Sequence, residues 1–289
     1  MSSSTIDIKP AKMEKQPLPW SLWWRQMRAI FRLEIEKNFL SRRSILLYLL
    51  ALIPIVPLVL LAPFTPPGNE WQDFTQYNMI FAIYYGGLIL RTVVFFGCAW
   101  IFMNLFRGDM IDRSLHFYFL SPVRRELLVA GKYLSGLVTS IILFTGTTII
   151  AMLLLYLPHF PAESSRYFLD GQGLGQLLTY AGITILACIG YGAFFLVVGL
   201  FFRNPIIPAI VLYGWEWLNF LMPPLLKKIS VIHYLNSLAP VPVYEGPFAV
   251  AALPTPAWIA VPSLVVVTAL VLIIASRRIR RMEIRYGSD

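Results

Sequence analysis

Six apolar stretches constrain this chain more than any other feature of its sequence. A helix of about 20 apolar residues is about 30 Å long, which matches the hydrocarbon core of a bilayer. The six stretches run roughly over residues 44–63, 79–106, 127–157, 176–202, 205–226 and 257–276. Of the 289 residues only 13% are charged, against about 25% in a soluble domain. The sequence therefore predicts an all-α polytopic membrane protein with six transmembrane helices.

The same composition excludes other classes of chain. Hydrophobic residues make up 57% of the sequence and many are aromatic, which argues against disorder. A disulfide-stabilised secreted fold is excluded because the chain has two cysteines, Cys98 and Cys188, and both lie inside apolar stretches. The net charge of +9 follows from membrane topology, so we do not expect nucleic acid as a partner.

The distribution of lysine and arginine predicts the orientation in the membrane. With six spans, 20 of the 24 basic residues fall on the side that holds both termini, three fall on the opposite side, and Arg91 lies inside the second stretch. Loops rich in these residues stay in the cytoplasm. We therefore expect a multi-pass protein of the cell (inner or plasma) membrane with both termini cytoplasmic. The first 19 residues are polar, so the first span is expected to act as an uncleaved anchor.

The stretches divide the chain into four segments. Residues 1–19 are expected to form a disordered cytoplasmic N-terminus, residues 44–276 the six-span domain, and residues 277–289 a basic cytoplasmic tail. Residues 20–43 are predicted to form an amphipathic interfacial helix, because two sets of side chains recur every three or four positions. The apolar set is Trp20, Trp24, Met27, Phe31, Ile35 and Phe39, and the charged set is Arg25, Arg28, Arg32 and Glu36.

The connection between the second and third stretches, about residues 107–125, is dense in charged and aromatic side chains. Its apolar residues have approximate helical spacing, and Pro122 marks the end of that pattern. The pattern predicts a short cytoplasmic helix joined to two spans, an element that can pass force from a soluble partner into the membrane. The plainer interpretation is a solvated loop whose apolar residues pack on the spans.

A family resemblance is carried by the run from Phe106 to Gly136, FRGDMIDRSLHFYFLSPVRRELLVAGKYLSG. This run is similar to the membrane subunit of ABC-2 type transporters. There the connection commonly ends in a Pro-hydrophobic-polar-Arg pattern followed by Gly-Lys, and these places are held here by Pro122-Val123-Arg124-Arg125 and Gly131-Lys132. The family often opens the connection with an acidic residue and a Gly-Thr pair, which Gly108-Asp109 matches without the threonine. The resemblance extends over about residues 20–285.

The resemblance implies a cytoplasmic N-terminal elbow helix, and a coupling helix that docks on a separate ATPase subunit. It also implies a homodimer or heterodimer of membrane subunits, with export as the direction of transport. The residues that it assigns to coupling are Asp109, Asp112, Arg113, Leu115, His116, Phe119, Pro122, Arg124 and Arg125. The chain has no Walker A sequence, since Lys132 is followed by Tyr133 in an apolar helix. ATP and Mg²⁺ are therefore expected on the partner, with no cofactor bound by this chain.

Two charged residues lie near the middle of apolar stretches. Arg91 is in the second stretch and Glu216, between two tryptophans, is in the fifth. Each costs roughly 2.5–3.5 kcal/mol to insert, so each should face protein or water. We hypothesise that they interact with each other, within or across protomers. They are candidates for the translocation pathway, and a purely structural ion pair is the plain alternative.

The remaining polar features favour no other class more strongly. A secondary, ion-coupled transporter predicts inverted repeats with broken helices, and no convincing repeat is present. A membrane-embedded enzyme needs clustered polar groups, but the three histidines lie in different connections and no pair has the spacing of a zinc site. The last external connection, about residues 225–256, suggests a short amphipathic helix followed by proline-rich extended chain. We therefore expect a transporter subunit rather than an enzyme.

Overall fold

The computed structural model describes residues 20–42, 44–61, 74–111, 124–156, 166–169, 171–243, 249–250 and 253–280. Within these ranges the chain is helical and has no strand. The elements in chain order are α1 (Trp20–Leu40), α2 (Ser44–Leu52), α3 (Ile55–Leu61), α4 (Phe74–Tyr84), the π-helix η2 (Tyr85–Val94), α5 (Phe95–Ile111), α7 (Arg125–Tyr156), α9 (Gly173–Phe201), α10 (Ile206–Trp217), the 3₁₀-helix η3 (Leu218–Leu221), α11 (Pro224–Lys227), α12 (Val231–Ser237) and α13 (Ala257–Arg280). The all-α expectation is confirmed for this part of the protein.

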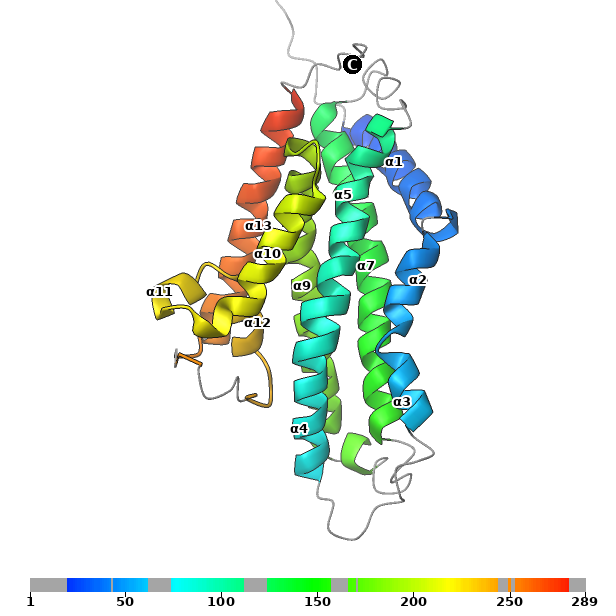
Figure 1. Cartoon of the computed structure of the whole chain (residues 1–289). Helices are drawn as coiled ribbons and strands as arrows, with labels where there is room; N and C mark the ends of the chain where they lie inside the picture. Colours follow the sequence, from blue (N-terminus) through cyan, green and yellow to red (C-terminus); the bar gives the residue numbers. More distant parts are fainter. Residues whose placement is uncertain are drawn as a thin grey trace, which may run out of the picture.

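Five helical segments are long and apolar enough to cross a membrane. They cover Ser44–Leu61, Phe74–Met110, Arg125–Tyr156, Gly173–Phe201 and Ala257–Arg280, and each coincides with one of the predicted stretches. Figure 1 shows them side by side, with α9 among α5, α7 and α13. Helix α1 packs along α7, near the end of the bundle where α5 finishes and α7 begins. A helix thus covers most of the predicted segment 20–43, whose place at the membrane interface stays a prediction.

The fifth predicted stretch is not the continuous helix that we expected over residues 205–226. Helix α10 ends at Trp217, after 12 residues, and a 3₁₀ turn follows it to Leu221. Twelve residues span about 18 Å, which is less than a bilayer core. A helix could not have continued to residue 226 in any case, because Pro223 lacks a backbone N–H and disfavours helix at Met222, and Pro224 begins the separate helix α11. Six membrane crossings therefore stay a prediction.

The predicted outer surface helix after this break is also different in the structure. Two short helices, α11 and α12, replace it. Leu225 and Ile229 are exposed, whereas Ile232 and Leu235 of α12 are completely buried against α9 and α13. Helix α12 is therefore part of the packed bundle and does not lie on its surface.

Close packing between α5 and α9 forms the centre of the molecule. A Cβ atom at Gly199 would lie 2.8 Å from the carbonyl oxygen of Met103, and one at Gly192 would overlap the ring of Phe102. Glycine is needed at both positions because any larger side chain would push the two helices apart. The second long segment contains the π-helix η2 between α4 and α5, a geometry often found at functional sites. It spans 37 residues, or about 55 Å, so it extends beyond the hydrocarbon core.

Candidate functional site

The predicted coupling residues fall into two groups in the structure. Asp109, Arg124 and Arg125 lie at the ends of α5 and α7 and are described. Asp112, Arg113, Leu115, His116, Phe119 and Pro122 lie outside the described residues. The structure therefore shows the two edges of the predicted coupling segment, and its own helical conformation stays a prediction.

A buried ionic cluster of four residues joins three helices at this edge. Glu34 and Lys37 come from α1, Asp109 from α5 and Lys132 from α7. The ammonium of Lys132 lies 2.6 Å from one carboxylate oxygen of Asp109 and also forms an ion pair with Glu34. The ammonium of Lys37 lies 2.6 Å from the other carboxylate oxygen of Asp109. The cluster therefore links two anions and two cations in one continuous network.

The burial of this ionic cluster makes its pairing important for the fold. Glu34, Asp109 and Lys132 have 1% or less of their surfaces exposed, and Lys37 is at the edge. The third donor position of Lys132 is used by the carbonyl oxygen of Leu105, at 2.8 Å. Removing one partner from a buried ion pair costs about 3–5 kcal/mol, because it leaves an uncompensated charge. The cluster therefore fixes helix α1 to the end of α5 and the beginning of α7.

The Gly-Lys pair of α7 has a clear structural reason. A Cβ atom at Gly131 would lie 3.0 Å from the side chain of Ile30 in α1, so the glycine lets the two helices approach closely. That approach brings Lys132 within reach of Glu34, one turn further along α1. Gly131 thus allows the close contact between α7 and α1, and Lys132 supplies the cation that pairs with Glu34.

Arg124 and Arg125 are both engaged with neighbouring helices. The guanidinium of Arg124 lies 4.1 Å from the ring centroid of Trp23 in α1. Arg125 donates hydrogen bonds to the carbonyl oxygens of Ile279 and Arg280, at 3.2 and 2.9 Å, and so caps the C-terminal end of α13. Cations at this position satisfy carbonyl groups that have no partner within the helix. The start of α7 is therefore tied to both α1 and α13.

Glu216 is held by neutral donors at the other predicted site. Its carboxylate accepts hydrogen bonds from the hydroxyl groups of Ser230 and Tyr191, at 2.8 and 3.2 Å, and from the backbone N–H groups of Val231 and Ile232, at 3.2 and 2.9 Å. Those two amides open α12, so Glu216 acts as its N-terminal cap from a different helix. Glu216 has 2% of its surface exposed.

Arg91 lies close to the same place. Its guanidinium carbon is 5.8 Å from the ring centroid of Trp217, the residue after Glu216. Arg91 therefore lies beside the residue that follows Glu216 in the chain. The direct ion pair between Arg91 and Glu216 stays a prediction, because the hydrogen bonds that we observe on Glu216 come from α9 and α12.

Arg91 also lines a cavity of about 550 Å³. The walls come from α4, η2, α9 and the segment after α10, and they include the polar side chains of Asn219, Lys227 and His233. The ammonium of Lys227 donates a hydrogen bond to the carbonyl oxygen of Val250, at 2.7 Å. The described ranges contain no group of three or more metal-ligating side chains. The cavity therefore brings polar side chains from the segment after α10 next to Arg91.

Comparison with known families decides the identity of the chain. A family model described as ABC-2 family transporter protein matches residues 30–213, well over half of the sequence. The chain belongs to this ABC-2 transporter family. No curated protein and no solved structure gives a significant match.

Several residues that build these sites in the ABC-2 chain were not singled out by the sequence pattern. The sequence pattern does not single out Glu34 and Lys37, because the recurring aromatic and apolar side chains are the stronger periodic signal in α1. A signal was present, since Ile30, Glu34, Lys37 and Ser41 recur every three or four residues and lie toward the bundle. Ser230 has no such signal, because its role depends on the fold that brings it to Glu216.

Proposed function

We propose that this chain is the permease subunit of an ABC-2 type exporter. In this proposal it forms the translocation pathway with a second permease subunit, identical or homologous, in the cell membrane. Both termini face the cytoplasm, and a separate ATPase subunit binds and hydrolyses ATP with Mg²⁺. Membership of the ABC-2 family and the five long apolar helices support a membrane transporter subunit.

The observation that carries this proposal is the buried ionic cluster at the edge of residues 112–123. Asp109 precedes that segment, and Arg125 and Lys132 follow it. Through these three residues the flanking helices α5 and α7 are fixed to α1 and α13. A push by a partner on the connecting segment would therefore move four helices together. This is the mechanical property that a coupling segment needs.

The pathway part of the proposal rests on the surroundings of Arg91. A charge at this depth is tolerated only where protein or water surrounds it. Arg91 belongs to the π-helix η2 and lines the polar cavity, while Glu216 anchors the short helix α12 that also borders this cavity. We propose that Arg91 faces the transported solute and that Glu216 positions the helix opposite it.

Co-purification with an ATPase tests the proposal. The chain would be affinity-purified from its native membrane, tested for a co-purifying Walker-containing ATPase subunit, and assayed for ATP hydrolysis and solute transport. Leu115→Ala and Phe119→Ala should weaken the association or uncouple ATP hydrolysis from transport. Leu169→Ala removes an exposed leucine that lies before the start of α9, and it should change neither the association nor the coupling. Transport by the purified chain alone, driven by an ion gradient, would contradict the proposal.

A further inference from the structure

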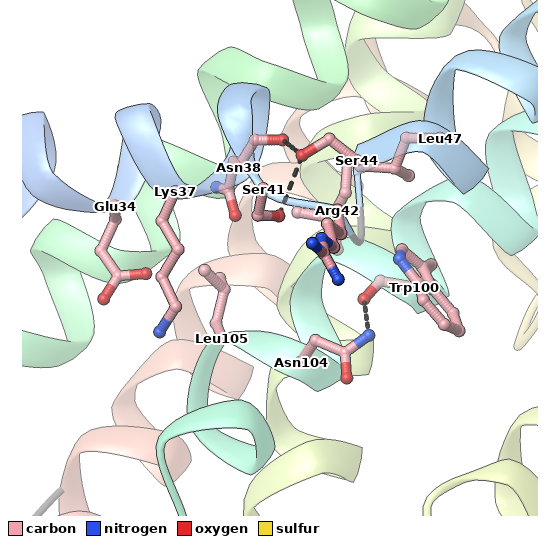
Figure 2. A pocket seen from close by; sticks show the side chains of 11 residues that line it. Glu34, Lys37, Asn38, Ser41, Arg42, Ser44, Leu47, Trp100, Asn104 and Leu105 are labelled. Atoms are coloured by element: carbon pink, nitrogen blue, oxygen red, sulfur yellow. Dashed lines mark hydrogen bonds between the residues drawn. The ribbon is translucent and has the colours of Figure 1, made fainter. Parts of the chain in front are cut away.

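A second cavity lies where α1 ends and the chain enters the first span. Its volume is about 280 Å³, and its walls come from α1, the turn after it, α2 and α5. Figure 2 shows the polar side chains that face it, among them Lys37, Asn38, Ser41, Arg42 and Asn104. A volume near the lower end for ligand pockets suits a headgroup rather than a whole lipid or a large solute. This site is separate from the cavity beside Arg91.

The charges around this cavity leave a single net positive charge. Glu34 is paired with Lys132, and Lys37 is paired with Asp109. In the described ranges no ion pair joins Arg42 to a carboxylate. Figure 2 shows the guanidinium of Arg42 directed into the space, with Asn104 and Trp100 on one side and Ser41 and Ser44 on the other. The cavity therefore favours a ligand with one negative charge.

The polar walls of the cavity are already ordered. The hydroxyl of Ser44 donates to the carbonyl oxygen of Asn38 at 2.5 Å and lies 3.1 Å from the hydroxyl of Ser41. The amide nitrogen of Asn104 donates to the carbonyl oxygen of Trp100 at 2.7 Å, which fixes that side chain as well. A ligand entering this space would meet hydroxyl and amide groups that are already fixed, so its binding would need to order only the exposed side chain of Arg42.

Apolar side chains next in sequence to the lining residues are exposed. Leu40 precedes Ser41 and Ile45 follows Ser44, and each is more than half exposed; Trp100, which lines the cavity, is 36% exposed. Tryptophan beside arginine is characteristic of the headgroup layer of a membrane. In the orientation proposed above, this opening faces the cytoplasmic leaflet. A ligand with a charged head and an apolar tail would place the head in the cavity and the tail along α2 and α5.

We propose that this cavity binds the phosphate headgroup of an anionic phospholipid from the cytoplasmic leaflet, with Arg42 as the main contact to the phosphate. Arginine suits this role because its planar group can donate two hydrogen bonds to phosphate oxygens. The bound lipid would fill the junction between α1 and the first span. Such a site goes beyond the transport function, and its position beside the ionic cluster would make the junction sensitive to lipid composition.

Lipid binding to the purified full-length chain tests this proposal. Native mass spectrometry would measure the affinity for short-chain phosphatidylglycerol and for phosphatidylcholine of the same chain length. The wild-type chain should prefer the anionic lipid. Arg42→Gln should weaken that binding about tenfold, because a charged hydrogen-bond donor is lost. Arg42→Lys keeps the positive charge and should lose less affinity for the anionic lipid than Arg42→Gln.

Arg203→Gln is the matched control, because it removes an exposed arginine from the turn between α9 and α10. The affinity of this variant for phosphatidylglycerol should stay within about twofold of the wild-type value, because a single exposed charge contributes little. An equal loss in this variant would overturn the proposal, since the effect would then be a diffuse attraction. Competition by millimolar inorganic phosphate, or equal binding of both lipids, would overturn it as well. The assay needs no ATPase, so its failure would leave the proposed permease function untouched.

Discussion

The two buried carboxylates at opposite predicted sites, Asp109 and Glu216, are stabilised in different ways. Asp109 lies between two lysines, and its charge is balanced by other charges. Glu216 accepts hydrogen bonds from two hydroxyls and from two amides at the start of α12. The first arrangement connects three long helices, while the second fixes one short helix. Charge pairing thus serves rigid attachment near the end of the bundle, and a helix cap serves local positioning inside it.

The largest expected effect comes from the Asp109 side of this comparison. Lys132→Met should lower the free energy of unfolding by about 3–5 kcal/mol, because it leaves Glu34 and Asp109 with too little positive charge. Thermal unfolding of the purified chain in detergent measures this. Adding Glu34→Met should recover part of the loss, since the pair is then removed as a unit. A loss below about 1 kcal/mol would show that the ionic cluster does not hold these helices together.

A smaller effect is expected on the Glu216 side. Glu216→Leu should cost about 2–3 kcal/mol, because buried donors of Ser230 and α12 lose their acceptor. Glu216→Gln keeps one acceptor oxygen and should cost about 1 kcal/mol. Unfolding measurements on both variants give the difference. Equal costs would mean that the negative charge, rather than the number of acceptors, stabilises α12.

Double-mutant cycles compare the two sites directly. The coupling energy between Arg91→Ala and Glu216→Gln should be about 0.5–1 kcal/mol, because the hydrogen bonds observed on Glu216 come from other groups. The cycle for Lys37→Met and Asp109→Asn should give a larger value. The double variant Arg91→Glu with Glu216→Arg should not restore the transport that Arg91→Glu alone abolishes. An arginine at position 216 cannot accept hydrogen bonds from the backbone N–H groups that open α12. Restored transport would support the direct pair instead.

The smallest effect is expected from an ion pair in solvent. Arg32 lies 3.2 Å from Glu36 on α1, and both side chains are largely exposed. Arg32→Ala should change the free energy of unfolding by about 0.3–0.5 kcal/mol, since water screens such pairs. The same unfolding assay supplies this reference value. A loss comparable with that of Lys132→Met would remove the contrast between buried and exposed pairs.

The sequence predicts the membrane helices well where the apolar pattern is long. Five of the six stretches correspond to a long helix, because twenty apolar residues leave the chain few other stable conformations. In the fifth stretch the observed helix is shorter than the predicted one. Average hydropathy is insensitive to a single proline such as Pro223, and it does not predict that Glu216 caps another helix. At the candidate sites the sequence indicated Arg91 and Glu216, since each is a charge within an apolar stretch, and the family resemblance indicated Asp109. Their partners were not predictable, because the contacts of Glu34 and Ser230 exist only once distant helices pack together.

The π-helix between α4 and α5 gives this long segment an adjustable winding. Each residue of an ordinary α-helix turns the chain by about 100°. Rewinding the ten residues of η2 into that tighter form would rotate α5 against α4 about the axis of the segment. Asp109 would then turn relative to α7, and Arg91 would turn relative to Trp217. One change of helical pitch would thus act at once on the end of the segment, at Asp109, and on its middle, at Arg91.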